Sequence, residues 1–380
     1  MIRKASRSFY VKKLKKIMTA ASRFLRQNWW VAPAMVLIVS SAAAAAILLR
    51  PQKTALPASS SDPADICAPA DKATFDCYKT ELTNIVKNKG PKPAFKLLKA
   101  SYDSVPLVKS QCHQLAHVVG RTAYTKYGDL SDTFAQGDHF CWAGYFHGSM
   151  EELALKKGFD YILNNASGIC SKIAAKERYS FYHYNCVHGM GHGFMMVQND
   201  DLFKSLASCD SMTDDWERQS CYGGSFMQNV MEAQNSPDHS SKFLKPNQPM
   251  YPCTAVAEKY KFQCYLMQTS YALEVSGYDF AKIFALCEGL TGSDAAYRAT
   301  CFQSAGRDAS GQSASDVERT VATCLQGGSD DAKTNCVIGA VKDFISYFNS
   351  DQQAAKLCEA LPPELQPICR STAKDYYSTF

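Results

Sequence analysis

The chain has 380 residues, of which 46% are hydrophobic and 20% charged, enough apolar side chains for one or two packed cores. Its formal net charge of +5 hides an asymmetry, because residues 1–53 hold eleven Lys and Arg and no acid, whereas residues 54–380 hold 30 basic and 36 acidic residues. The body therefore lacks the basic balance of a nucleic-acid-binding surface, and no nucleic-acid partner is expected.

The N-terminus predicts a membrane anchor. Residues 1–30 form a basic tail, and residues 31–49, VAPAMVLIVSSAAAAAILL, are an uncharged run just long enough to span a bilayer. Trp29 and Trp30 precede this run, where interfacial aromatics are common, and the basic tail should stay in the cytoplasm. We therefore expect residues 31–50 to be a single-pass transmembrane signal-anchor, with the body periplasmic or extracellular. A cleaved signal peptide is the alternative, because SSAAAAA offers small-residue cleavage sites.

Sixteen cysteines, an even number, support export, because cysteines outside the cytoplasm oxidise to disulfides. Residues 51–66, rich in Pro, Ser and Ala, predict a linker, so residues 67–380 should form the extracytoplasmic domain. Most cysteines there lie 10 to 16 residues from a neighbour, and sequential pairing is the economical hypothesis. It predicts the pairs Cys67–Cys77, Cys170–Cys186, Cys209–Cys221, Cys253–Cys264, Cys287–Cys301, Cys324–Cys336 and Cys358–Cys369.

Cys112 and Cys141 lack a near partner in the sequence. We expect them to bridge each other across the first two repeats. The alternative is a pair of thiolates beside His113 and His147, which would form a Cys/His metal or redox site. No CxxC motif occurs in the chain, which disfavours zinc ribbons and thioredoxin-type sites.

The second cysteines of successive pairs, from Cys186 to Cys369, recur every 33 to 43 residues, a period typical of helical repeats. Segments such as 293–309 open on a polar cluster and continue with apolar residues at helical spacing. Shorter helical runs such as DLFKSLASC end on the first cysteine. The sequence therefore predicts an all-α, disulfide-stapled α-solenoid of helical hairpins, whose architecture resembles Sel1 and TPR repeats. Neither consensus is present, so the resemblance implies an architecture and no functional residue.

Histidine is concentrated in the first repeats, with seven of the eight residues between positions 113 and 192. Three predicted helices carry metal-ligating side chains four residues apart, which differ by about 40° around a helix and share a face. These pairs are His113 with His117, His147 with Glu151, and His188 with His192. Imidazole and carboxylate are ligands of zinc, iron, copper and manganese, so we expect a divalent transition metal as cofactor.

The position of these histidines within the repeats strengthens this expectation. His147 and His192 both lie six residues after a repeat cysteine, and His117 lies five after its own. The equivalent downstream positions hold Met227, Ser270, Arg307 and Lys342. Neighbouring helices lie about 8–10 Å apart, so three helices can share one ion only where the array curves tightly. A dinuclear site, or a third histidine in the outer coordination sphere, fits as well.

The glycines of YNCVHGMGHGFMM raise a separate question. Gly189, Gly191 and Gly193 interrupt the predicted helix, and each costs about 1 kcal/mol in a helix interior. Three in five residues should loosen or end the helix unless they allow something else, such as the approach of a ligand to the backbone. His139 and His239 lie in polar, loop-like surroundings and are expected to be structural.

No HExxH, GxSxG, P-loop or CxxCH motif occurs, so the sequence names no reaction. The first hypothesis is a membrane-anchored metalloprotein. It leaves open whether the metal also supports catalysis, in which case Glu151 could act as a general base. The second is a non-catalytic scaffold that binds a protein, peptide or glycan on the solenoid face. Metal storage or transfer is the third. Restriction of the histidine pairs to three repeats favours the first.

Overall fold

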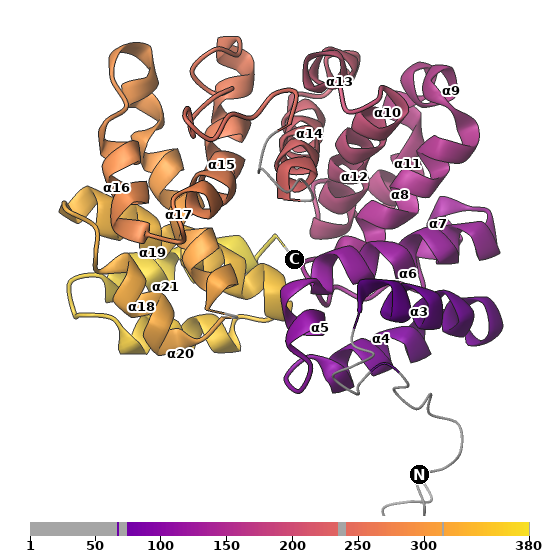
Figure 1. Cartoon of the computed structure of the whole chain (residues 1–380), viewed down its shortest axis with the longest axis horizontal. Coiled ribbons are helices and arrows are strands. Elements are labelled where there is room, and N and C mark those ends of the chain that lie inside the picture. The colour runs from indigo at the N-terminus through magenta and orange to yellow at the C-terminus, as the bar shows by residue number, and fades with distance from the viewer. Residues whose placement is uncertain (1–66, 68–73, 235–240, 314, 380) are drawn as a thin grey trace, which may run out of the picture. The chain divides into compact units, whose positions relative to one another are not determined.

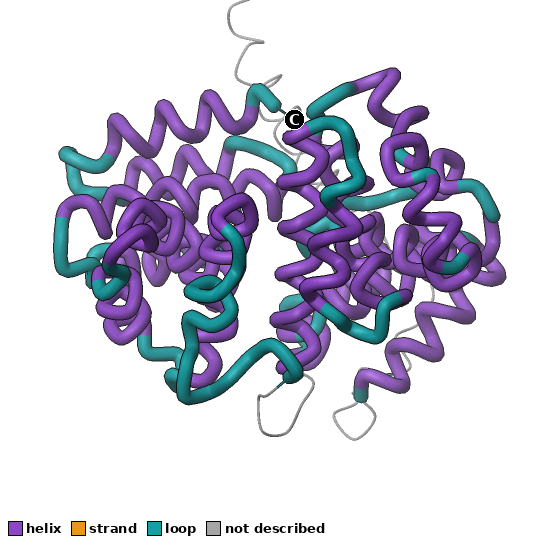
Figure 2. Tube along the Cα trace, turned by 90° about the horizontal axis from the view of Figure 1, so that it is seen from above, coloured by secondary structure: helices purple, strands orange, loops and turns teal. Residues whose placement is uncertain are grey.

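Helices make up the regular structure of this computed structural model, which describes Cys67 and residues 74–234, 241–313 and 315–379 (Figures 1 and 2). No strand occurs within these residues, so the all-α prediction is confirmed. All of them belong to one compact unit, Pro63–Phe380.

Long helices pack side by side in chain order, and shorter helices connect them. The long helices are α3 (Phe75–Lys89), α6 (Cys112–Tyr127), α8 (Gly144–Lys157), α12 (Phe181–Val197), α14 (Asp215–Gln234), α15 (Glu258–Val275), α17 (Arg298–Gln312), α19 (Asp330–Phe348) and α21 (Gln366–Tyr377). The connecting helices are α4 (Pro91–Ser101), α5 (Pro106–Ser110), α7 (Leu130–Phe134), α9 (Phe159–Asn164), α10 (Ala166–Ile169), α11 (Ser171–Glu177), α13 (Leu202–Cys209), α16 (Phe280–Glu288), η2 (Gly292–Tyr297), α18 (Val317–Cys324) and α20 (Gln352–Ala360).

The polar clusters before the helices act as N-caps, as their composition predicts. The Ser180 hydroxyl accepts a hydrogen bond from the third backbone N–H of α12, and Asp201 and Ser329 do the same for α13 and α19. Such caps satisfy backbone donors that no helical carbonyl can reach, and each stabilises its helix by about 1 kcal/mol.

Seven of the eight disulfides fasten a short helix or loop to the next long helix, and Cys112–Cys141 joins the start of α6 to the loop before α8. The structure pairs all sixteen cysteines, in the seven pairs that the spacing predicts together with Cys112–Cys141. In α13 and α14, for example, the bond joins the last residue of one helix to the second turn of the next. Loops of this length gain roughly 3 kcal/mol from closure in chain-entropy terms. Eight disulfides indicate an oxidising, extracytoplasmic environment.

Helix α19, late in the array, touches the segment between α4 and α8 near its start (Figure 1). The Trp142 indole N–H, just before α8, donates to Asp343 Oδ1 on α19 at 3.1 Å. The Tyr347 ring lies 4.7 Å from that of Trp142 and 6.2 Å from that of Tyr102. We call this contact the seam. An open stack leaves its end repeats without such partners.

The predicted tail at 1–30, anchor at 31–50 and linker at 51–66 lie outside the described residues. Among the helices that are described, none has both the length and the apolar character needed to cross a bilayer.

Candidate metal centre

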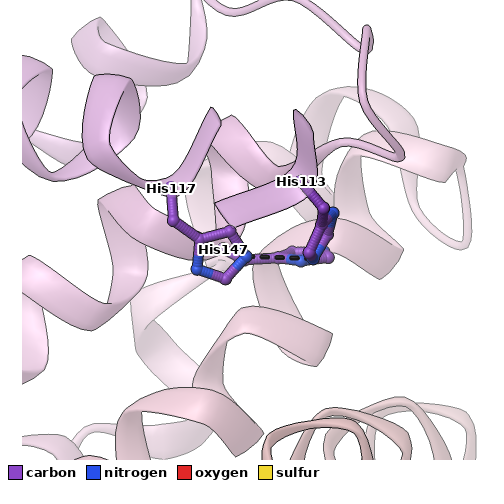
Figure 3. A group of neighbouring side chains, drawn as sticks. All are labelled: His113, His117 and His147. Atoms are coloured by element: carbon purple, nitrogen blue, oxygen red, sulfur yellow. Dashed lines mark hydrogen bonds between the residues drawn. The ribbon is translucent and has the colours of Figure 1, made fainter. Parts of the chain in front are cut away.

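Five histidines and one glutamate from three helices meet inside the domain. His113 and His117 come from α6, His147 and Glu151 from α8, and His188 and His192 from α12. Neighbouring imidazole centroids lie 4.6–5.6 Å apart. Figure 3 shows three of these rings drawn together, with a dashed line from His117 to His113. The group, called the histidine cluster below, is buried except for the half-buried His113.

Glycines at the helix contacts explain how three helices reach one point. A Cβ on Gly148 of α8 would lie 2.2 Å from the carbonyl oxygen of His117 on α6. A Cβ on Gly224 of α14 would lie 1.9 Å from the carbonyl oxygen of His188 on α12. No side chain fits at these distances, so glycine sets how closely the backbones approach. This close packing provides what the sequence alone left open, a cluster shared by three successive helices.

The same packing answers the question raised by the glycines of α12. The helix runs unbroken through Gly191 and Gly193. A Cβ on Gly191 would lie 2.1 Å from the Cys221 carbonyl oxygen on α14, and one on Gly193 would lie 2.9 Å from the Ala154 Cβ on α8. The expected loosening is therefore wrong, because tertiary contacts on both sides of α12 outweigh the low helix propensity of glycine.

Two overlapping triads within the cluster place their ligand atoms within 4.8 Å of one another. They are His113, His117 and His147, and His147, His188 and His192. In the second triad, one nitrogen of each ring is buried without a hydrogen-bond partner among the described residues, namely His147 Nδ1, His188 Nε2 and His192 Nε2. Buried polar atoms are nearly always paired, so three orphan nitrogens in one triad call for a ligand.

The opposite nitrogen of each ring is held by a neighbouring side chain. His147 Nε2 lies 3.1 Å from Asn185 Oδ1, and His192 Nδ1 lies 2.8 Å from Gln228 Oε1. Both acceptors are oxygens, because each amide nitrogen already donates elsewhere, to the Phe181 carbonyl and to Glu232. The two rings must therefore carry their protons on this side, which leaves lone pairs on the orphan nitrogens.

His188 is held in a similar way. Its Nδ1 lies 3.0 Å from the Tyr184 hydroxyl, which can donate or accept. If Tyr184 accepts, the third orphan nitrogen also presents a lone pair. A hydrogen-bonded outer partner on each histidine is the usual arrangement around a protein-bound metal.

His113 and His117 form the other side of the cluster. His113 Nδ1 donates to the Cys141 carbonyl oxygen at 2.9 Å, and His117 Nδ1 donates to Glu151 Oε1 at 2.9 Å. Their Nε2 atoms face each other at 3.0 Å. Two lone pairs at this distance repel unless a proton or a metal ion lies with them. Two nitrogens bound to one ion at about 2.0–2.1 Å are themselves roughly 3.0–3.4 Å apart.

Glu151 lies behind the rings rather than among the orphan nitrogens. Oε1 contacts His117 Nδ1 and lies 3.7 Å from His192 Nδ1, and Oε2 accepts from Arg121 Nε at 2.7 Å. Burial raises the pKa of Glu151, but His117 and Arg121 lower it by more, so its pKa lies well below the usual range. The carboxylate is therefore ionised in the folded chain.

Burial favours the neutral form of four imidazoles of the cluster, those of His113, His147, His188 and His192. It lowers the pKa of His113 to about 3 and that of His192 to about 4. Burial, followed by the neighbouring histidines, also holds the pKa of His147 and of His188 well below the ordinary value. The neutral imidazole is the form that binds a metal ion.

The remaining histidines lie apart from the cluster. His183 is on α12, but its Nε2 lies 3.2 Å from Glu217 Oε1 and its ring stacks on Trp216. His139 packs among aromatic rings, including those of Phe146 and Tyr182. His239 lies outside the described residues.

Sequence reasoning missed the outer partners of the cluster. Arg121 follows His117 by four residues and continues the pattern of His113 and His117, a pattern that could have revealed it. Gln228 follows the predicted inward position, Met227, by one residue. Nothing in the local sequence distinguishes Asn185. Comparisons with protein-family models, with known proteins and with solved structures found no match to this chain.

Proposed function

We propose that this chain is an extracytoplasmic metalloprotein that binds one divalent transition metal ion on the histidine cluster. The observation that carries the proposal is the set of buried nitrogens without partners, two of which, His147 Nδ1 and His192 Nε2, must present lone pairs. A metal-free interior gains nothing from such atoms, because an unsatisfied buried polar group costs about 1–3 kcal/mol.

The available ligand atoms limit which metal ions can bind. All cysteines are oxidised, so no thiolate is available, and the ligands are imidazole nitrogens. Imidazole suits zinc, copper and iron, with manganese favoured only if oxygen ligands join. Both triads share His147, which supports one ion rather than two. Glu151 then serves as an outer carboxylate that orients His117, because its oxygens contact Nδ1 atoms and Arg121.

Membrane attachment is part of the same proposal. The uncharged run at 31–49, the basic tail before it and the eight disulfides after it support a single-pass anchor at 31–50 with the histidine cluster on the oxidising side. This arrangement would expose the cluster to metal ions outside the cytoplasm.

Metal-dependent catalysis is the second candidate function. The half-buried His113 favours it, because the exposed edge of the cluster lies on that side and water could reach a bound ion there. A metal-bound water would need such an open position. Storage or transfer of the ion requires no substrate site and is the simpler use of the same geometry.

Elemental analysis of the full chain, purified with its disulfides intact, tests the proposal. The protein is stripped with a chelator, supplied in turn with zinc, copper, iron and manganese, and desalted. We expect one ion per chain in the wild type, none in His147→Ala/His192→Ala, and one in His183→Gln, a control on the same helix. A wild type without stoichiometric metal, or a double variant that binds as well as the wild type, overturns the proposal.

A further inference from the structure

A cavity open to solvent lies at the seam, where early and late parts of the chain meet. Its volume is about 680 Å³, within the range of about 300–1,000 Å³ that is usual for small-molecule sites. Three segments line it, namely the end of α4, the loop between α7 and α8, and the end of α19. The cavity therefore exists only because α19 returns to the start of the array.

Four aromatic rings line this cavity. Tyr102 and Tyr347 are buried, and the ring of Phe140 contacts both, at centroid distances of 5.3 and 6.3 Å. Phe348 packs edge-on against Tyr347 at 4.7 Å and keeps 38% of its surface exposed. A single exposed phenylalanine is ordinary on a protein surface, but this one belongs to a group of rings that share a cavity. The buried tyrosines fix the group, so Phe348 offers a flat apolar surface at a defined position.

Polar side chains with unused hydrogen-bonding groups surround these rings. Asp103 is exposed and forms no ion pair with any described residue, and the side-chain amide of the exposed Asn349 has no hydrogen-bond partner among them. Lys99 donates to Asp138 at 2.6 Å, which leaves two of its three N–H groups for a ligand. A carboxylate accepts, an ammonium donates and an amide does both, so together they match hydroxyl groups, which donate and accept.

The charges at the cavity disfavour ionic ligands. Burial lowers the pKa of His139 to about 4, so this lining residue is neutral, and the one lysine and two aspartates of the lining give a net charge of −1 that repels an anion. Ammonium groups already lie over the rings, since Lys99 Nζ is 5.6 Å from the centroid of Phe140 and Lys109 Nζ is 5.7 Å from that of Tyr102. A cationic ligand that sought the same ring faces would meet these groups. A neutral ligand meets neither repulsion.

We propose that this cavity binds a neutral oligosaccharide, with a sugar ring stacked on Phe348 and its hydroxyl groups bonded to the polar side chains around that ring. A pyranose has an apolar face of C–H groups and a rim of hydroxyls, and the negative face of an aromatic ring attracts the slightly positive C–H hydrogens. A purely apolar ligand would remove water from the polar side chains without replacing its hydrogen bonds. The inference does not rest on the proposed function, because no residue of the histidine cluster lines the cavity.

Calorimetric titration of the full chain, in a detergent without a sugar head group, tests the class of ligand. The probes are tetrasaccharides that differ in charge: cellotetraose, maltotetraose and chitotetraose are neutral, tetragalacturonate is anionic, and the tetramer of glucosamine is cationic. We expect at least one neutral probe to bind with a dissociation constant of about 1 mM or below, and both charged probes to bind at least tenfold more weakly. Failure of every neutral probe to bind, or tighter binding of a charged one, overturns the inference.

Variants titrated with the neutral probe that binds test the position of the site. Phe348→Ala should weaken binding about tenfold, because it removes the stacking surface, whereas Phe262→Ala, at a ring 48% exposed on α15, should match the wild type. Asn349→Gly removes the amide but keeps the left-handed backbone of this position, at φ 48°, and should weaken binding about three- to tenfold. Unchanged binding by folded Phe348→Ala overturns the inference. His147→Ala/His192→Ala should lose metal and keep the sugar, so failure of the histidine site and failure of the sugar site give different results.

Discussion

Two asparagines at the same place in two repeats show how one scaffold serves two purposes. Asn185 and Asn335 each stand immediately before a repeat cysteine, and each donates from Nδ2 to the carbonyl four residues earlier, at 2.8 and 3.0 Å. The Oδ1 of Asn185 meets His147 Nε2 at 3.1 Å, whereas that of Asn335 meets Gln303 Nε2 at 3.0 Å. The repeat supplies the position, and the residue on the adjacent helix decides its use.

The interior around the histidine cluster, in the N-terminal half, and the interior around Asp308, in the C-terminal half, differ in the same way. Between α15 and α17 the Asp308 carboxylate accepts from Thr269 at 2.6 Å, from Ser270 at 2.8 Å and from Arg307 at 2.8 Å. Donors and acceptors are matched in that group, whereas the histidine cluster leaves nitrogen atoms without partners. A matched buried network contributes to stability, and unmatched lone pairs are useful only with a ligand.

The largest effect on stability should follow from loss of Asp308. Asp308→Ala removes the acceptor shared by the half-buried Arg307 guanidinium, the buried Thr269 hydroxyl and the half-buried Ser270 hydroxyl, which should destabilise the fold by about 3 kcal/mol. Denaturant unfolding measures the loss, and elemental analysis should still find one metal ion per folded chain. Arg307→Met/Asp308→Ala should recover part of the stability, because removing both charges avoids the unpaired one. Loss of metal from folded Asp308→Ala would contradict the view that the C-terminal network serves stability and not metal binding.

A second acid in the C-terminal half should respond to pH. Burial raises the pKa of Asp343 at the seam to about 6, above the value of roughly 3.9 for an unfolded chain. Between these values the folded protein binds more protons than the unfolded one, so stability falls as pH rises from about 4 to about 6, by up to about 3 kcal/mol. Asp343→Asn keeps an acceptor for Trp142 and should lose this part of the pH dependence.

Unfolding by urea at a series of pH values checks that prediction. The difference between the wild type and Asp343→Asn isolates the one group, since all other titrating groups are common to both. Asp375→Asn, at an exposed acid on α21, should follow the wild-type curve. Identical curves for the wild type and Asp343→Asn would show that the seam carries no buried charge.

Close packing by glycine occurs in both halves and can be tested in both. A Cβ on Gly148 would lie 2.2 Å from the His117 carbonyl oxygen, and one on Gly339 would lie 1.8 Å from that of Gln303. Gly→Ala at either site should destabilise the fold by about 1–3 kcal/mol, because backbone must move. Only Gly148→Ala should also weaken metal binding, since it moves α8 away from the histidines of α6. Zinc titration of the folded variants makes the distinction, and an equal loss in Gly339→Ala would contradict it.

Local patterns in the sequence were sufficient to predict the helices, the cysteine pairs and the shared face of each histidine pair. Cys209 and Cys221 lie 12 residues apart, and that spacing is enough to predict that they pair and join the end of one helix to the next. His188 and His192 share a helix face for the same local reason. These features are determined by residues that lie within a few tens of positions of one another in the sequence.

The seam and the outer partners depend on contacts between distant residues. Trp142 and Asp343 lie 201 residues apart, and no periodicity links them. Gln228 holds His192 only because Gly224 allows α14 to approach α12, so its role follows from a backbone distance. The glycines of α12 suggested a loosened helix because each was considered alone, without the helices that pack against it.

The matched asparagines offer the finest test, with the smallest expected effect on stability. Asn185→Ala removes the acceptor that fixes the His147 proton on Nε2, which frees the ring to turn its lone pair away from the cluster. Loss of such an outer partner should weaken zinc binding by about 10–100-fold without abolishing it. Asn335→Ala removes the same side chain from the equivalent position but should leave the zinc affinity unchanged. Zinc affinity that falls equally in both variants would mean that the asparagine acts through the backbone of its own helix, whereas a fall in Asn185→Ala alone would locate its effect at His147.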